Sequence, residues 1–197
     1  MEKILYVHGF NSTPYSNTYN TFKKLLNPDF YELHTIDYDP KDPKTAVAEI
    51  KKYVKENEID TIIGSSLGGF LTLNIFGVSR IVINPCWNPA VELPLIGYDG
   101  PTDVYKTMLA DLRQALDDEE AGLVSGCFAP EDELLGKKYV NIFQKYFLRL
   151  YAIPGGHRVS NEAAELIVND ILPKHEYETN DFVRKYLDAD MLPMWLD

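Results

Sequence analysis

Cysteine is scarce in this sequence, which has only Cys86 and Cys127 among 197 residues. Two cysteines are too few for a disulfide scaffold, and their spacing does not suit a metal site. We therefore expect two reduced, mostly buried thiols in a cytoplasmic protein. The chain also lacks an apolar run long enough to span a bilayer, and no signal-peptide core follows Met1. These absences argue against a membrane protein.

Positive charge is also scarce, because 19 Lys and Arg stand against 30 Asp and Glu, which gives a formal net charge of −11. A nucleic-acid surface needs clustered basic side chains over the phosphates, so nucleic acid is not an expected partner. The same balance disfavours docking on anionic lipid. A Gly-x-Gly-x-x-Gly motif and a P-loop are missing as well, which argues against nucleotide binding.

What the sequence does contain is a regular alternation of short apolar runs and segments of helical periodicity. It has no internal repeat and no linker, so we expect a single domain over residues 1–197. Strands separated by helices predict an α/β fold with about six mainly parallel strands and helices on both faces. Ligands of such sheets bind beyond the carboxyl ends of the strands, so functional residues should follow strands. The predicted strands are 3–7, 31–38, 60–64, 80–84, 123–128 and 148–153, and the predicted helices are 18–26, 67–76, 137–146, 161–172 and two that begin near 43 and 102.

The segment Gly64-Ser65-Ser66-Leu67-Gly68 lies between the third predicted strand and the helix after it. A Gly-x-Ser-x-Gly sequence at such a junction is typical of a nucleophile elbow, a sharp turn that lifts the serine hydroxyl above the sheet. Side chains two residues before and after the serine would collide with neighbouring backbone. Ser66 has glycines at both offsets, whereas Ser65 has Ile63 and Leu67 there. Ser66 is therefore the candidate nucleophile.

The sequence offers four histidines as the base that a serine nucleophile needs. His34 lies within a strand and His175 lies in a polar tail, so both are interpreted as structural or solvent-exposed. His8 and His157 both follow strands. His157 comes late in the chain, after two glycines that allow close approach to the serine, and the order Ser, Asp, His is the expected one. His157 is therefore the candidate base.

The acid of the triad should follow a strand between the nucleophile and the base. An acidic loop follows the fifth predicted strand, and Asp132 is the candidate there. Glu131 and Glu133 are close rivals, because the assignment depends on position alone. Weaker alternatives are Asp99 and Asp103, which follow the fourth strand.

Stabilising the tetrahedral intermediate requires two N–H donors aimed at its oxyanion. One donor should be the backbone N–H of Leu67, the residue after the nucleophile, and the other should come from the loop after the first strand. Phe10 is the expected donor in that loop, with Asn11 as the alternative and as a substrate contact. His8 is expected to brace this loop, since no further metal ligand lies near it at suitable spacing.

The less regular region from Trp87 to Glu120 falls where a lid over the pocket would be inserted. Trp87 and Tyr105 could line an apolar acyl site there, although aromatic residues in such a region are often plain core. The stretch 174–197 follows Pro173, which is expected to end the last helix of the domain. It is expected to add one amphipathic helix, with Phe182, Tyr186 and Leu187 on its apolar side.

Four short segments together resemble the YqiA-type esterases: His8-Gly9-Phe10-Asn11-Ser12, Gly64 to Gly69, Asn84-Pro85 and Gly155-Gly156-His157. Members of that family are compact α/β hydrolases whose sheet lacks the first two strands of the larger enzymes. The resemblance covers roughly residues 1–172, and 87–120 matches poorly. It implies esterase or thioesterase activity on small acyl substrates without a cofactor, with Ser66, Asp132 and His157 as the triad. The family's acid loop tends to read Gly-Asp-Glu, and Glu131 replaces that glycine here.

The sequence therefore predicts a serine hydrolase that forms an acyl-enzyme on Ser66. A protein that keeps the fold and pocket but only binds or regulates is the alternative.

Overall fold

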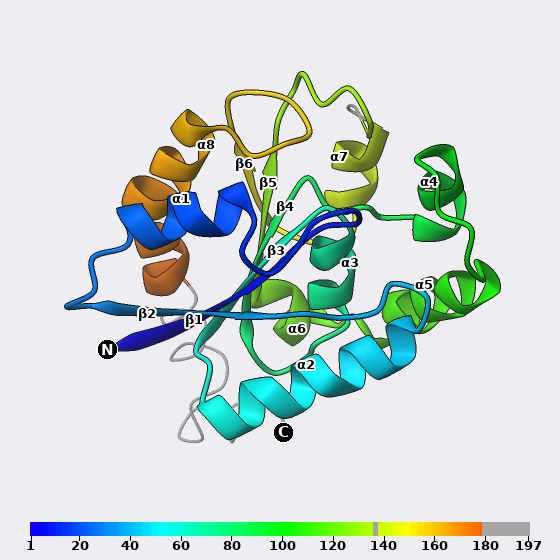
Figure 1. Cartoon of the computed structure of the whole chain (residues 1–197), viewed down its shortest axis with the longest axis horizontal. Coiled ribbons are helices and arrows are strands. Elements are labelled where there is room, and N and C mark those ends of the chain that lie inside the picture. Colours follow the sequence, from blue (N-terminus) through cyan, green and yellow to red (C-terminus); the bar gives the residue numbers. More distant parts are fainter. Residues whose placement is uncertain (136–137, 179–197) are drawn as a thin grey trace, which may run out of the picture.

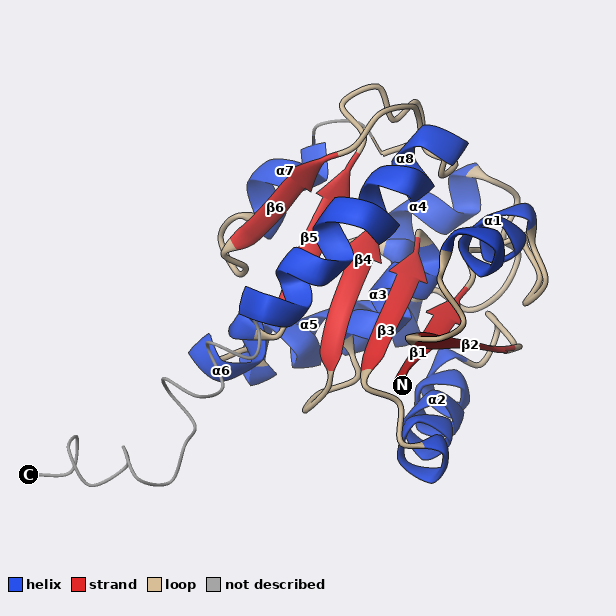
Figure 2. Ribbon diagram, turned by 90° about the vertical axis from the view of Figure 1, so that its left-hand side faces the viewer, coloured by secondary structure: helices blue, strands red, loops and turns tan. Residues whose placement is uncertain are grey.

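A computed structural model describes residues 1–135 and 138–178 of the chain. Its centre is one six-stranded sheet in the order β2-β1-β3-β4-β5-β6, in which every neighbouring pair is parallel (Figures 1 and 2). The parallel six-stranded sheet expected from the sequence is thus present, and each strand lies within two residues of its predicted position. The strands are β1 Glu2–Val7, β2 Tyr31–Ile36, β3 Thr61–Ser65, β4 Ser79–Ile83, β5 Val124–Phe128 and β6 Arg149–Ala152.

The register of the strands brings their carboxyl ends to one edge of the sheet. Val7 at the end of β1 lies beside Gly64 of β3, and Ser65 lies beside Ile83 of β4. Ile83 in turn lies beside Cys127 of β5. The loops that leave these strands therefore begin side by side, although long stretches of sequence separate them.

Helices cover both faces of the sheet, as Figure 2 shows with α1 and α8 on the near side and α3, α4 and α5 behind. The two faces have separate cores, because successive side chains of a strand point to opposite sides. In β1, Ile4 and Tyr6 pack in the cluster with α1 and α8, whereas Leu5 and Val7 pack in the cluster with the remaining helices. The helices are α1 Asn17–Leu25, α2 Pro43–Asn57, α3 Leu67–Leu73, α4 Pro89–Leu95, α5 Asp103–Ala115, α6 Asp118–Gly122, α7 Lys138–Phe143 and α8 Asn161–Leu166.

Residues 87–120 hold α4, α5 and the start of α6, more helix than the irregular region expected from the sequence. The inner side of this segment belongs to the main core. Tyr105 is fully buried, and its hydroxyl donates to the carbonyl of Pro40 at 2.6 Å. The segment is thus packed against the sheet domain, and a lid function for it stays a prediction.

The prediction that Pro173 ends the last helix is wrong. After α8 the backbone forms a π-helical turn over Ile167–Ile171, and helix then continues through residues 172–178. The π-helical turn shifts the pairing of N–H and carbonyl groups in the residues after it. Pro173 therefore removes one backbone N–H donor without ending the helix. His175 lies in this continuation and is fully buried, not exposed. The expected helix through Phe182, Tyr186 and Leu187 lies outside the described residues.

In the part of the chain that the structure describes, no helix combines the length and the apolar character needed to cross a membrane.

Candidate active site

Ser66 sits at the turn between β3 and α3 with a backbone φ of 54° and ψ of −117°. A positive φ is strained for a residue with a side chain and persists only when the surroundings hold it. The N–H of Ser66 donates to the carbonyl of Ile83 at 3.0 Å, and its own carbonyl accepts from the N–H of Cys86 at 3.0 Å. The turn is therefore held on both sides of the serine, by the end of β4 and by the segment that follows it.

The glycines around Ser66 have the close packing that the sequence predicts. A Cβ at Gly64 would overlap the Thr72 hydroxyl and the Gly68 carbonyl, and one at Gly68 would overlap carbonyl oxygens of the first-strand loop. That loop also comes near the serine itself, since a Cβ at Gly9 would lie 3.1 Å from the Ser66 Cβ. Side chains at these positions would push the neighbouring backbones apart.

Ser66, His157 and Asp132 form one continuous chain of hydrogen bonds across the carboxyl edge of the sheet. His157 Nε2 lies 3.0 Å from Ser66 Oγ, and His157 Nδ1 lies 2.9 Å from Asp132 Oδ2. A carboxylate only accepts hydrogen bonds, so Nδ1 carries the proton and Nε2 is left to accept from the serine hydroxyl. This is the arrangement in which an imidazole can remove a proton from serine.

Asp132 is kept ionised by its surroundings in the acid loop, residues 129–135. It is only 6% exposed, and its Oδ1 accepts from the N–H groups of Leu134 and Leu135, both at 2.8 Å. Burial alone would raise the pKa of Asp132, but the bonds from His157 and the two backbone N–H groups outweigh it and lower the pKa. A negative charge therefore stands behind His157.

The other acidic candidates have different positions. Glu131 is exposed, whereas Glu133 Oε2 accepts from the backbone N–H of His157 at 2.9 Å. That bond lowers the pKa of Glu133 below its usual value. Neither rival reaches the His157 ring among the described contacts. Asp99 and Asp103 instead pair with lysines, Asp99 with Lys41 at 2.7 Å and Asp103 with Lys106 at 2.8 Å.

The loop after β1 is the one that the sequence offers as the oxyanion loop. Asn11 in this loop has a left-handed backbone with a φ of 55°. His8 braces the loop, because its ring stacks on Tyr38 with centroids 4.6 Å apart and its Nε2 lies 3.3 Å from Asp37. Leu67 is the first residue of α3, and the backbone N–H groups of a helix's first turn have no acceptor within the helix. The donor functions of Leu67 and Phe10 stay predictions.

Trp87 and Tyr105 do not face an open surface in this structure. Trp87 is 1% exposed and stacks on Tyr146 with centroids 5.3 Å apart. Tyr105 packs edge-on against Phe70 at 5.9 Å. Both rings therefore pack as core residues, which is the alternative to an acyl site that the sequence left open. Asn11, by contrast, is exposed.

Two contributions to the site were not foreseen from the sequence: the Glu133 bond to the His157 backbone, and Asn84. The sequence marks Asn84 only through the Asn84-Pro85 pair. It directly follows β4 at the carboxyl edge, 2% exposed, and its side chain bonds to the loops of both the acid and the base. The signal in the sequence that could have identified Asn84 is a polar residue directly after a strand at this edge.

Within residues 1–135 and 138–178, no group of three or more His, Cys, Asp or Glu side chains is placed to hold a metal ion. Cys86 and Cys127 are both buried thiols, and burial raises the pKa of the Cys127 thiol.

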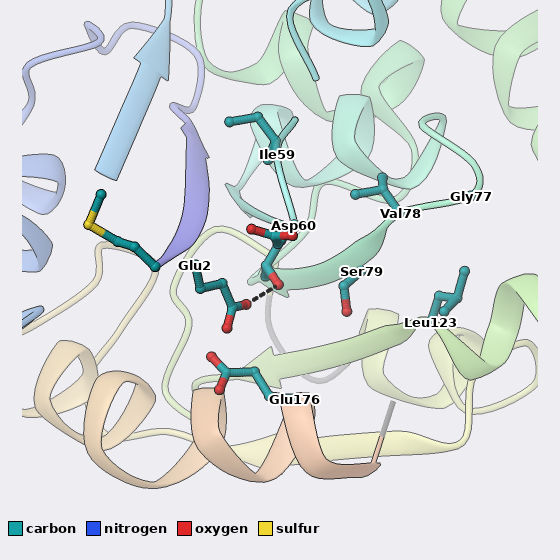
Figure 3. A pocket seen from close by; sticks show the side chains of 10 residues that line it. Glu2, Ile59, Asp60, Gly77, Val78, Ser79, Leu123 and Glu176 are labelled. Carbon is teal, nitrogen blue, oxygen red and sulfur yellow. Dashed lines mark hydrogen bonds between the residues drawn. The ribbon is translucent and has the colours of Figure 1, made fainter. Parts of the chain in front are cut away.

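A second serine–histidine contact lies at the opposite, amino edge of the sheet. His175 Nε2 is 2.9 Å from Ser79 Oγ, and its Nδ1 is 2.7 Å from Ser125 Oγ. Ser79 borders a hollow of about 560 Å³ at the amino ends of β1, β3 and β4. Figure 3 shows Glu2 and Glu176 facing one another there. Burial and the neighbouring Glu2 raise the pKa of Glu176 to about 7.

Comparison with known proteins relates the chain to one protein family and its fold to several solved structures. A model of the uncharacterised protein family UPF0227 matches residues 3–102. Among solved structures, the esterase domain of a Rhodothermus marinus protein superposes with a TM-score of 0.65 at 13% identity, covering 91% of this chain and 86% of that one. The ydeN gene product from B. subtilis superposes with a TM-score of 0.63 at 16% identity, covering 90% of this chain and 100% of that one. Est1E from Butyrivibrio proteoclasticus superposes with a TM-score of 0.62 at 15% identity, covering 94% of this chain and 88% of that one. These likenesses confirm the α/β-hydrolase fold that the sequence predicts.

Proposed function

The chain belongs to the uncharacterised protein family UPF0227, the family of the YqiA-type proteins, and from that premise we propose that it hydrolyses carboxylic esters or thioesters through an acyl-enzyme on Ser66. The observation that carries the proposal is the unbroken path from Ser66 Oγ through the His157 ring to Asp132, with contacts of 3.0 and 2.9 Å. The similarly folded Rhodothermus marinus protein is described as an esterase domain, which agrees with the proposal.

In the first half of the proposed reaction, His157 Nε2 takes the proton of Ser66 as Oγ attacks the acyl carbon. The carbonyl oxygen becomes an oxyanion, which the N–H groups of Leu67 and Phe10 would stabilise. Asp132 holds the ring orientation and stabilises the imidazolium. The intermediate collapses when His157 gives its proton to the departing alcohol or thiol, which leaves the acyl group on Ser66.

In the second half, a water molecule replaces the leaving group. His157 removes a proton from the water while its oxygen attacks the acyl carbon, and it then returns the proton to Ser66 as the free acid departs. The partner of the protein is thus a small acyl ester or thioester. The reaction needs no cofactor, since both proton transfers use the same imidazole.

The direct test is the hydrolysis of p-nitrophenyl acetate by the wild type, Ser66→Ala and the control Ser65→Ala. We expect a burst of nitrophenolate matching the enzyme concentration, and a loss of about 10⁴-fold or more in kcat/KM for Ser66→Ala only. The mass of the intact wild type should rise by one acetyl group. Retained hydrolysis in Ser66→Ala with loss in Ser65→Ala would overturn the nucleophile, and an inactive wild type would favour a binding protein.

A further inference from the structure

Asn84 occupies an unusual position directly after β4. Its backbone φ is 43°, a left-handed conformation that asparagine tolerates better than most residues with a side chain. Its N–H still donates to the carbonyl of Cys127 at 2.8 Å, which continues the ladder between β4 and β5. The side chain is thereby held between the loops that follow β5 and β6.

The Asn84 amide uses both of its ends. Its Oδ1 accepts from the N–H of Ala129 at 2.8 Å, while its Nδ2 donates to the carbonyls of Gly156 and His157, both at 3.1 Å. The backbone groups determine this orientation, because an N–H only donates and a carbonyl only accepts. Turning the amide over would place its oxygen against two carbonyls.

These bonds join the two loops that carry the acid and the base. Ala129 opens the acid loop, and its carbonyl accepts from the N–H of Asp132 at 3.2 Å. The base loop, residues 153–160, contains His157 behind two glycines, of which Gly155 has a φ of 92°. Glycines leave this backbone few constraints of its own. The loop therefore depends on contacts from outside to keep one shape.

The His157 backbone is held on both sides of its Cα. Its N–H donates to Glu133 from the acid loop, and its carbonyl accepts from Asn84, which directly follows β4. The position of the ring follows from these two anchors, since the backbone sets where the imidazole begins. An error of about 1 Å in the placement of a reacting group can reduce a rate about 100-fold.

We propose that Asn84 is a positioning residue: its amide keeps the acid loop and the base loop in register, so that His157 stays within reach of Ser66 and Asp132. The inference rests on the proposed hydrolytic function and deepens it. Asn84 does not touch the reacting atoms and acts through the backbone of His157.

The test compares Asn84→Gly with the matched control Asn74→Gly. Glycine suits the positive φ of Asn84 and removes all three side-chain bonds. Asn74 is a buried asparagine as well, and its Nδ2 donates to one carbonyl, that of Phe70 at 2.9 Å, at the far end of α3. We expect kcat for p-nitrophenyl acetate to fall about 100-fold in Asn84→Gly, with KM within about twofold, and to stay within about twofold in Asn74→Gly.

The pH profile supplies a readout that lost stability would not change. When His157 drifts from Asp132, its imidazolium loses a stabilising charge, so the acidic limb of kcat/KM should move to lower pH in Asn84→Gly. Asn84→Asp is a second variant that keeps the volume and the acceptor for Ala129 but sets a carboxylate against two carbonyls. It should lose at least as much kcat as Asn84→Gly.

Two outcomes separate this inference from the proposed function. A folded Asn84→Gly or Asn84→Asp with the wild-type kcat and pH profile, in a protein whose activity depends on Ser66, overturns the inference alone. Equal hydrolysis by the wild type and Ser66→Ala overturns the proposed function and the inference with it.

Discussion

The two edges of the sheet each bring a serine against a histidine, and the two contacts are almost equally short. At the carboxyl edge His157 lies 3.0 Å from Ser66, and at the amino edge His175 lies 2.9 Å from Ser79. Distance alone therefore does not separate a candidate nucleophile from a structural hydroxyl. The difference lies in the backbone that carries each serine and in the partner behind each ring.

The serines differ in backbone. Ser66 stands in a strained turn at the start of a helix, where its hydroxyl is lifted above the sheet. Ser79 is the first residue of β4, and Ser125 lies inside β5, so both belong to regular strands. Ligands of parallel sheets approach the carboxyl edge, where the loops diverge and helices begin.

The partners behind the rings differ in charge. His157 has the ionised Asp132 at its Nδ1, which stabilises a positive ring. Among the described residues, the hydroxyl of Ser125 is the hydrogen-bond partner of His175 at the same ring atom. Burial first, and then the positive charges of Arg149 and Arg80, lower the pKa of His175 to about 3. His175 therefore stays neutral near pH 7 and is a poor proton acceptor, so a serine–histidine contact needs a carboxylate before it resembles a base.

The largest expected effect on this comparison is a loss of hydrolysis when the Nδ1 partner of His157 is changed, set against the same change at His175. Asp132→Asn should lower kcat/KM for p-nitrophenyl acetate by about 10³- to 10⁴-fold. The new amide would keep its oxygen on the N–H groups of Leu134 and Leu135 and turn its NH₂ toward His157, which favours the wrong tautomer. Ser125→Ala, which removes the corresponding partner of His175, should stay within about twofold. Equal losses in the two variants would contradict the difference drawn between the edges.

The next effect concerns stability at the amino edge. His175→Ala should lower the free energy of unfolding by about 2–4 kcal/mol, because it opens a cavity and leaves the Ser79 and Ser125 hydroxyls without their partner. Urea denaturation measures this change. Tyr177→Ala, at a residue 74% exposed on the same helix, should change stability by less than about 0.5 kcal/mol. A folded His175→Ala that loses hydrolysis would show that the amino edge takes part in the chemistry.

The smallest effect is a pH dependence at the hollow of the amino edge. The pKa of Glu176 is raised to about 7 in the folded protein from an ordinary 4.5, so the folded state holds this proton more tightly than the unfolded chain. The stability that this proton contributes is present below about pH 4.5 and is lost as pH rises through 7. Solvent screens the group, so we expect Glu176→Gln to be more stable than the wild type by only about 1 kcal/mol at pH 8.

Thermal or urea unfolding at pH 5 and pH 8 measures this effect. At pH 5 the wild type and Glu176→Gln should differ much less than at pH 8. Glu165→Gln, at an exposed residue of α8, should follow the wild type at both values. A constant difference between Glu176→Gln and the wild type across this range would show that the carboxyl does not titrate as described.

The sequence predicts the sheet well because buried parallel strands read as short apolar runs bounded by loops. The position of Ser66 could also be predicted, since glycine at two fixed offsets is a local steric requirement that Ser65 does not meet. Position in the sequence favours Asp132 as the acid, but it separates Asp132 only weakly from Glu131 and Glu133. Three adjacent acids have nearly the same spacing to every other residue, and the direction of each side chain is what separates them.

The amino edge was harder to predict for a different reason. His175 and its partners Ser79 and Ser125 are 96 and 50 residues apart in the chain, and no local pattern links them. Pro173 pointed to the end of a helix, and the wide turn that precedes it is a feature that periodicity does not reveal. Asn84 was missed as part of the site because its bonds go to loops that follow two other strands.

The measurement that tests the central claim most directly is the mapping of a fluorophosphonate label on the wild-type protein by peptide mass spectrometry. The label forms a covalent bond only with a serine that a neighbouring base activates. We predict one label per chain, on the peptide that carries Ser66, and none on Ser65 or Ser79. A label on Ser79, or no label at all, would contradict the assignment of the carboxyl edge as a serine hydrolase site.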